Sequence, residues 1–210
     1  MKLQVALDVE TMEQAKAILD SAGEYVDIVE VGTILYFYGL PAVAELKKCY
    51  PQLEMLADIK IYDGGYETAE AAFRYGADYV TVMGIVDDVT IQGVIKAARE
   101  FGKKVVVDMI ACNNFAERVK QIDAMKPDII NVHVACDVQS ATNTPFEQLN
   151  ICRMLVKNAQ ISVAGGVNRH NIGEVAGAKP DIVISGMGII GQEDPGDAAK
   201  AIKDAMLAMG

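Results

Sequence analysis

The chain has 210 residues and a formal net charge of −10 at pH 7, with 51% hydrophobic and 23% charged residues. This composition supports one sizeable hydrophobic core and excludes a disordered chain. The acidic balance argues against a general binder of nucleic acids or anionic membranes, since both kinds of partner need a basic surface.

The N-terminal segment and the cysteines are typical of a cytoplasmic protein. The apolar stretch 3–7 is too short for a signal peptide, and no run of about 18 apolar residues suggests a membrane helix. The four cysteines form no C-x-x-C pair, so we expect free thiols. The two histidines, His133 and His170, are too few for a histidine-rich metal site, whereas an oxygen-ligand site for Mg²⁺ is compatible with the sequence.

Short runs rich in valine and isoleucine recur about every 20 to 30 residues, and a helical pattern follows each run. Such runs are typical of parallel strands buried on both faces. We therefore expect an α/β fold, a (β/α)8 TIM barrel, with residues 1–210 forming a single domain. The expected strands are 3–7, 26–31, 54–59, 79–83, 104–109, 128–132, 160–164 and 181–184.

Local signals mark the ends of several helices. Thr11 and Gln14 have the spacing of a capping box, which predicts that a helix begins at residue 12. Gly76 and Gly102 stand where two later helices are expected to end.

An aspartate begins each even-numbered expected strand, and these aspartates recur about every 50 residues, the period of two βα units. They are Asp27, Asp78, Asp128 and Asp181. Their position at the amino ends of the strands indicates a structural role, the capping of loop amides.

Three further aspartates, Asp8, Asp58 and Asp108, close the first, third and fifth strands. Because alternate strands contribute side chains to the same layer of a barrel, these carboxylates are expected to converge at the catalytic end. Alternation along the strands also turns Glu30, Lys60, Asn131 and His133 inward.

The segment 58–63 has the pattern Asp-x-Lys-x-x-Asp, with Lys60 on the inner face of the third strand and Asp63 in the loop beyond it. A lysine flanked by acids is suited to stabilising a developing oxyanion. A buried group of carboxylates also needs cations, and Mg²⁺ held by Glu30 and Asp58 would supply one. The alternative interpretation is a structural ion-pair network around Lys60.

Two glycine loops follow the seventh and eighth strands, Gly165-Gly166 and Gly186-Met187-Gly188. Loops at these positions form the usual phosphate site of TIM barrels, because glycine lets backbone amides approach an anion. Alternatively, the glycines only allow tight turns. His133 ends the sixth strand beside the expected metal, which favours acid–base duty over a structural role. His170 is expected on the surface.

The chain resembles the orotidine 5′-monophosphate decarboxylase suprafamily and, within it, the 3-hexulose-6-phosphate synthases. The resemblance runs through the whole chain. Its motifs are Leu7-Asp8, the segments 29–33, 57–63 and 107–110, Val132-His133 with Asp137 and Gln139, and the segment 164–167.

The resemblance implies Mg²⁺, replaceable by Mn²⁺, bound by Glu30 and Asp58, and Asp8 bound to substrate hydroxyls. It implies a homodimer in which Asp63 reaches the partner's active site. The amides of Gly166 and Gly186 would bind phosphate. The expected catalytic residues are therefore Lys60, Asp63, Asp108 and His133, and the expected substrate-binding residues are Asp8, Gly165, Gly166, Gly186, Met187 and Gly188.

The implied reaction is an aldol addition of formaldehyde to D-ribulose 5-phosphate, with His133 as the base. The resemblance leaves 3-keto-L-gulonate-6-phosphate decarboxylase as an alternative, although that enzyme carries arginines where this chain has Cys136 and Met187. A ribulose-phosphate epimerase needs histidines on the second and third strands, and this chain has none there. A non-catalytic barrel that binds a sugar phosphate is the alternative from another functional class.

Overall fold

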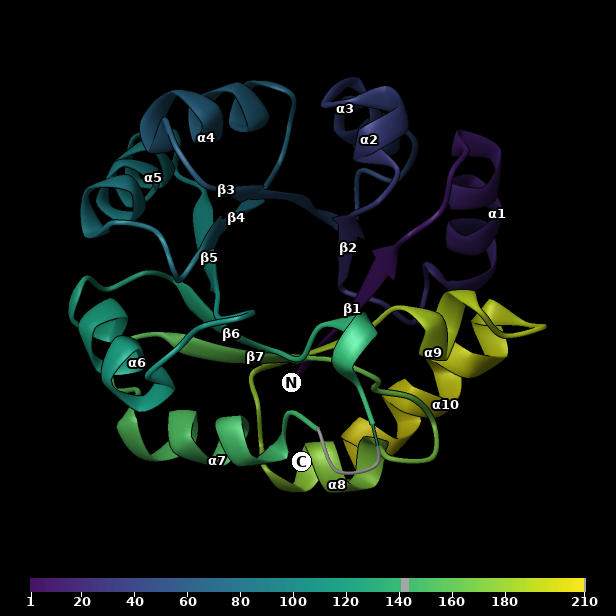
Figure 1. Cartoon of the computed structure of the whole chain (residues 1–210). Helices are drawn as coiled ribbons and strands as arrows, with labels where there is room; N and C mark the ends of the chain where they lie inside the picture. Colours follow the sequence, from purple (N-terminus) through teal and green to yellow (C-terminus); the bar gives the residue numbers. More distant parts are fainter. Residues whose placement is uncertain (141–143, 210) are drawn as a thin grey trace.

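The computed structural model describes residues 1–140 and 144–209. Eight parallel strands pair in sequence order, and β8 (Ile182–Ser185) pairs with β1 (Lys2–Leu7), which closes the barrel. Figure 1 shows the helices arranged in a ring around the strands, which confirms the expected TIM barrel. The other strands are β2 (Ile28–Val31), β3 (Glu54–Ile61), β4 (Tyr79–Met83), β5 (Lys104–Asp108), β6 (Ile129–His133) and β7 (Gln160–Ala164).

The helices begin and end where local chemistry indicates. Both hydrogen bonds of the capping box between Thr11 and Gln14 form at the start of α1 (Met12–Ala22). Gly102 ends α5 (Asp88–Phe101) in the left-handed conformation, with φ 63°. The others are α2 (Leu35–Tyr38), α3 (Pro41–Cys49), α4 (Gly65–Arg74), α6 (Phe115–Ala124), the 3₁₀ helix η1 (Cys136–Val138), α7 (Phe146–Leu155), α8 (Ile172–Gly177), α9 (Met187–Ile190) and α10 (Pro195–Ala208).

Several strands begin or end a few residues away from the expected positions. β2 begins at Ile28 rather than at residue 26, and β6 begins at Ile129 rather than at residue 128. The aspartate in front of each of these strands, Asp27 or Asp128, uses its side chain to cap the neighbouring strand. β3 runs two residues further than expected, to Ile61.

The apolar core has two parts. The larger part lies between the outer faces of the strands and the helices. The smaller part fills the barrel interior with residues such as Ile28, Leu56 and Ile129, which lie towards the amino ends of their strands. The polar side chains gather at the carboxyl ends of the strands, beside apolar ones such as Ala164 and Ile184. Within the described part of the chain, no helix is long and apolar enough to cross a membrane.

The four aspartates at the amino ends of the even strands each accept a hydrogen bond from a backbone amide of the preceding odd strand. The pairs are Asp27 with Leu3 at 2.7 Å, Asp78 with Met55 at 3.0 Å, Asp128 with Val105 at 2.9 Å and Asp181 with Ile161 at 2.8 Å. The expected structural capping role is therefore confirmed, but the expectation of loop amides is wrong, because the capped amides belong to strands. Each contact satisfies a polar group at the lower end of the barrel.

Asp78 forms salt bridges with two lysines, Lys47 at 2.8 Å and Lys103 at 2.7 Å. Burial opposes the charged form, but the hydrogen bonds from Lys103 and Lys47 outweigh it, so the pKa of Asp78 lies below its usual range. A depressed pKa in the folded state stabilises the fold above the unfolded-state pKa, and that stabilisation is lost in acid.

We predict that Asp78→Asn lowers the free energy of unfolding at pH 7 by about 1–3 kcal/mol, because it removes two charge-assisted hydrogen bonds. Urea unfolding at pH 7 and pH 3 would measure this. The difference from the wild type is expected to shrink below about pH 4, where aspartates become protonated. Asp204→Asn, which breaks the exposed pair with Lys200, is the matched control and is expected to leave the urea midpoint almost unchanged. An equal difference at both pH values would contradict the charge-based explanation.

Candidate active site

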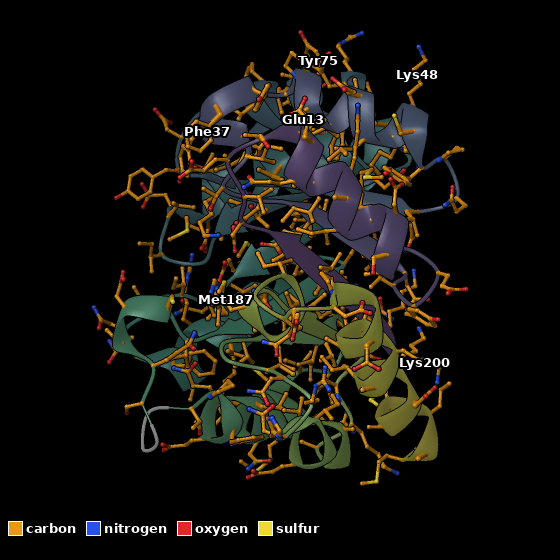
Figure 2. All side chains as sticks on the ribbon, turned by 90° about the vertical axis from the view of Figure 1, so that its right-hand side faces the viewer. Glu13, Phe37, Lys48, Tyr75, Met187 and Lys200 are labelled. Atoms are coloured by element: carbon orange, nitrogen blue, oxygen red, sulfur yellow. The ribbon has the colours of Figure 1, made fainter. Side chains whose placement is uncertain are left out.

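The carboxyl ends of the strands surround a cavity of about 750 Å³. Figure 2 shows Phe37 and Met187, which follow β2 and β8, towards one end of the molecule, and Lys48 at the opposite end. Apart from Asp63, every expected site residue lines this cavity. These lining residues are Asp8, Glu30, Asp58, Lys60, Asp108, His133, Gly165, Gly166, Gly186, Met187 and Gly188.

Lys60 lies between two carboxylates. Its ammonium group forms a salt bridge with Asp58 and lies 3.7 Å from Oδ2 of Asp108. Burial disfavours the ammonium ion, but the charges of Asp58 and Asp108 outweigh it and raise the pKa of Lys60 above its usual range. Lys60 therefore carries a positive charge at neutral pH and can stabilise negative charge in the cavity.

An irregularity in β3 orients the Lys60 backbone. The pairing of β3 with β4 shifts register between Ala57 and Ile61, and Lys60 adopts φ 41°, a left-handed conformation. Its backbone amide donates to Oγ1 of Thr81 at 2.8 Å, and the Thr81 hydroxyl in turn donates to Asp58 at 2.8 Å. Thr81 thus compensates for the lost ladder bond and holds Asp58 and Lys60 in one arrangement.

Glu30 faces the same cavity from β2. Burial and the charge of Asp58 raise its pKa well above the usual range, while Lys60 and a hydrogen bond from Gln4 oppose this rise. Nε2 of Gln4 donates to Oε2 of Glu30 at 2.6 Å, from a side chain that is almost fully buried. Glu30 is therefore held in place but lacks enough positive charge around it.

Asp108 and His133 form a hydrogen-bonded pair. Nδ1 of His133 lies 2.8 Å from Oδ2 of Asp108, whose side chain is 2% exposed. Burial acts to raise the pKa of Asp108, but the hydrogen bond with His133 and the charge of Lys60 outweigh it and lower that pKa. When Nδ1–H of His133 donates its hydrogen bond to the Asp108 carboxylate, Nε2 is left as the ring nitrogen that can accept a proton from a ligand.

Asp8 lies at the mouth, where Thr33 orients it. The Thr33 amide and hydroxyl donate to Oδ1 of Asp8 at 3.0 and 2.8 Å. A Cβ on Gly32 would lie 2.5 Å from this same oxygen, so the glycine makes room for the carboxylate. Asp8 is thus fixed with one oxygen bound and its side chain accessible to a ligand.

The two glycine loops lie side by side at the cavity rim. Gly165 and Gly166 both have positive φ, 116° and 72°, which favours glycine at these positions. A Cβ on Gly188 would lie 2.2 Å from the backbone oxygen of Val167, so the loops after β7 and β8 are in direct contact. The hydroxyl of Ser185 also donates to this oxygen, at 2.7 Å. Together the loops provide a glycine-rich surface suited to an anion.

Asp63 does not line the cavity of its own chain. It is exposed in the loop after β3, and its Oδ1 accepts a hydrogen bond from the Gly64 amide at 2.8 Å. The structure therefore does not bring Asp63 together with the other expected site residues of its own chain.

Sequence reasoning missed several lining residues. Gln4 and Thr81 lie on strands with inward side chains, and strand alternation could have found both. Arg169 and His170 also line the cavity, although His170 is exposed as expected. These two residues lie in a loop, where no periodic pattern indicates side-chain direction.

The donor atoms in the cavity fit Mg²⁺ bound by two carboxylates. In residues 1–140 and 144–209, no group of three or more His, Cys, Asp or Glu side chains is arranged to hold a metal. Glu30 and Asp58 nevertheless carry hard oxygen donors that a cation could share, and the charge of Asp58 contributes to the raised pKa of Glu30. A divalent cation would remove this repulsion, and Mg²⁺ is commonly held by one or two carboxylates together with water and substrate oxygens.

Comparison with known proteins shows relatives over the whole length of the chain. A sequence profile of the orotidine 5′-phosphate decarboxylase / HUMPS family matches residues 1–202. The 3-hexulose-6-phosphate synthase of Bacillus subtilis is 41% identical over 209 residues, which cover 99% of this chain and 99% of that protein.

Solved structures of related proteins also match the whole chain. The crystal structure of 3-hexulose-6-phosphate synthase from Salmonella typhimurium has a TM-score of 0.97 and 40% identity, and the match covers 100% of both chains. A crystal structure of KGPDC from Streptococcus mutans has a TM-score of 0.89 and 25% identity, with 99% of this chain and 98% of that chain covered.

Proposed function

The chain belongs to the orotidine 5′-phosphate decarboxylase / HUMPS family and is a carbon–carbon lyase, and on this premise we propose that it adds formaldehyde to D-ribulose 5-phosphate in a Mg²⁺-dependent aldol reaction. The observation that carries the proposal is the contact of one oxygen of Asp108 with both His133 and Lys60, at 2.8 and 3.7 Å. This arrangement puts a proton acceptor beside a fixed positive charge, as the formation of an enediolate requires.

In the proposed reaction, His133 removes a proton from C1 of the ketose through Nε2. Asp108 holds the imidazole ring and stabilises the positive charge that the ring gains. Lys60 stabilises the negative charge that develops on the substrate oxygens. C1 then forms a bond to the formaldehyde carbon, and the aldehyde oxygen takes up a proton, which gives a 3-hexulose 6-phosphate.

Glu30 and Asp58 would hold the Mg²⁺ ion, and Asp8 would bind substrate hydroxyls. When bound, Mg²⁺ supplies Lewis-acid polarisation of the ketose carbonyl. The rim loops, with Gly165, Gly166, Gly186, Met187 and Gly188, would receive the phosphate through backbone amides.

Decarboxylation of 3-keto-L-gulonate 6-phosphate is the second candidate, because the same cavity can stabilise its enediolate. Cys136 and Met187 both line the cavity, and neither supplies the cation implied for that reaction. The named synthases are also more similar to this chain than the KGPDC structure, at 41% and 40% identity against 25%. A non-catalytic sugar-phosphate binder would need the rim loops but not the pair of His133 and Asp108.

The proposed assembly is a homodimer with shared active sites. Asp63 is exposed outside its own cavity, and the side chains of Tyr36, Phe37 and Tyr62, near the same end of the barrel, are 88%, 56% and 70% exposed. Exposed large hydrophobic side chains near one end of a barrel support an interface there.

Subunit mixing tests the shared site. We predict that inactive Asp63→Ala and inactive Lys60→Ala subunits regain part of the activity when they exchange, because one site of each mixed dimer then has both residues. Native mass spectrometry would verify exchange. Verified mixed dimers without activity would argue that Asp63 does not serve the partner's site.

Metal dependence gives a second prediction. Glu30→Gln and Asp58→Asn are expected to weaken Mg²⁺ binding, measured by calorimetry, and to lower kcat/KM by about 100-fold or more, because each loses a charged ligand. Mn²⁺ is expected to replace Mg²⁺. Glu10→Gln, which changes an exposed carboxylate outside the cavity, is the control. Full activity of wild-type protein in EDTA would contradict the metal assignment.

Proton exchange separates synthesis from decarboxylation. In D₂O without formaldehyde, the wild type is expected to exchange one C1 hydrogen of ribulose 5-phosphate, as proton NMR would show. His133→Asn should slow this exchange by about 100-fold or more, the usual scale for a general base, and should leave Mg²⁺ binding nearly unchanged.

The outcomes of this experiment distinguish three cases. A wild type that shows no exchange and releases CO₂ from 3-keto-L-gulonate 6-phosphate would replace the synthase proposal by the decarboxylase. A wild type inert towards both substrates would favour the non-catalytic binder. Undiminished exchange in His133→Asn would preserve the reaction but assign the base to another group.

A further inference from the structure

The acidic groups of the cavity would repel the phosphate group of a phosphorylated ligand. Asp8, Glu30, Asp58 and Asp108 are acids, and Lys60 is already engaged by two of them. A phosphate group that carries up to two negative charges would enter this acidic surrounding. Backbone amides at the glycine loops provide partial charges, and a full positive charge nearby would offset the repulsion more strongly.

Arg169 provides such a charge. Among the described residues that line the cavity, Lys60 and Arg169 are the side chains that remain positively charged at all physiological pH values. Arg169 lies three residues after Gly166, in the loop between β7 and α8, so it is on the same rim as the glycine surface. Met187, on the neighbouring loop, is 66% exposed and uncharged.

The loop that carries Arg169 is held by hydrogen bonds on both sides of this residue. The side-chain amides of Asn168 and Asn171 both donate to the backbone oxygen of Gly166, at 3.0 and 2.9 Å. Asn168 also receives the His170 amide at 2.8 Å. These contacts engage a carbonyl oxygen that would otherwise repel an anion, and they fix the backbone from which Arg169 extends.

The guanidinium group keeps donors available. One nitrogen of Arg169 lies 3.2 Å from Asp197, whose side chain is 64% exposed, while the Arg169 side chain is 35% exposed. An exposed pair of this type contributes little to stability, so a better acceptor can replace it. A guanidinium group has five N–H donors in a planar fork, which matches the oxygens of phosphate.

We propose that Arg169 binds the phosphate group of the sugar phosphate and supplies the positive charge of the phosphate subsite. This inference rests on the proposed function for the identity of the sugar, but its chemistry needs only a phosphate monoester at the rim. Arg169 binds and orients the ligand and takes no part in proton transfer.

Binding without turnover tests the proposal. Calorimetry with Mg²⁺ present and formaldehyde absent would compare ribulose 5-phosphate, unphosphorylated ribulose and inorganic phosphate on wild-type protein, Arg169→Gln and Arg169→Lys. Arg169→Gln is expected to weaken binding of ribulose 5-phosphate by about 10- to 100-fold, the effect of losing a charge-assisted hydrogen bond. Arg169→Lys should recover part of this loss. Arg153→Gln, which changes an exposed arginine of α7 outside the cavity, should bind as the wild type does.

The controls separate this proposal from the proposed function. If the wild type and Arg169→Gln bind ribulose 5-phosphate equally well, the role of Arg169 is overturned and the proposed function stands. If Arg169→Gln weakens ribulose as much as ribulose 5-phosphate, Arg169 does not act on the phosphate and the proposal fails. If wild-type protein binds neither ribulose 5-phosphate nor inorganic phosphate, both proposals fail. Circular dichroism spectra that match the wild type would establish that each variant is folded.

Discussion

The carboxylates at the amino ends of the even strands hold neighbouring strands at a fixed stagger, and the position of the active site depends on them. Asp27 accepts the Leu3 amide through its side chain, and its own backbone amide donates to the Leu3 oxygen at 2.8 Å. The same pairing recurs between Asp78 and Met55. These contacts align the amino ends of neighbouring strands. The residues at the carboxyl ends are therefore also aligned, and they face one cavity. Asp8, Asp58 and Asp108, at or near the carboxyl ends of β1, β3 and β5, line one cavity for this reason.

At the carboxyl ends of the strands, several carboxylates lie close together, so their mutual repulsion must be offset by positive charge. Lys60 offsets Asp58 and Asp108, and the pKa directions follow from this arrangement: that of Lys60 is raised and that of Asp108 is lowered. Glu30 lies beyond adequate compensation, and its pKa is raised. Negative charge is thus offset near His133 but not near Glu30. A cation is therefore expected to bind beside Glu30.

Strand periodicity predicted most of this site because side-chain direction inside a barrel follows residue parity. Asp58, Lys60 and His133 were placed on the inner face by counting alone, and all three line the cavity. The register shift that gives Lys60 its φ of 41° was not predictable, since no glycine marks it and Thr81 compensates for it through a contact distant in sequence. The position of Arg169 at the cavity was not predicted, for a related reason. Its loop is shaped by side-chain hydrogen bonds to a backbone oxygen, and no sequence period records such contacts.

The close approach of Gly188 to Val167 has a consequence for how this rim can change over evolutionary time. No side chain fits at residue 188 while the Val167 oxygen keeps its position, and the hydroxyl of Ser185 holds that oxygen. The two loops therefore pack as one unit at this point, and a side chain at residue 188 would require the loop after β7 to move. Arg169 and Met187 carry partly or largely exposed side chains, 35% and 66%, and this close backbone contact does not restrict them. A lineage can therefore alter the charge of the rim by single substitutions while the backbone beneath it stays the same.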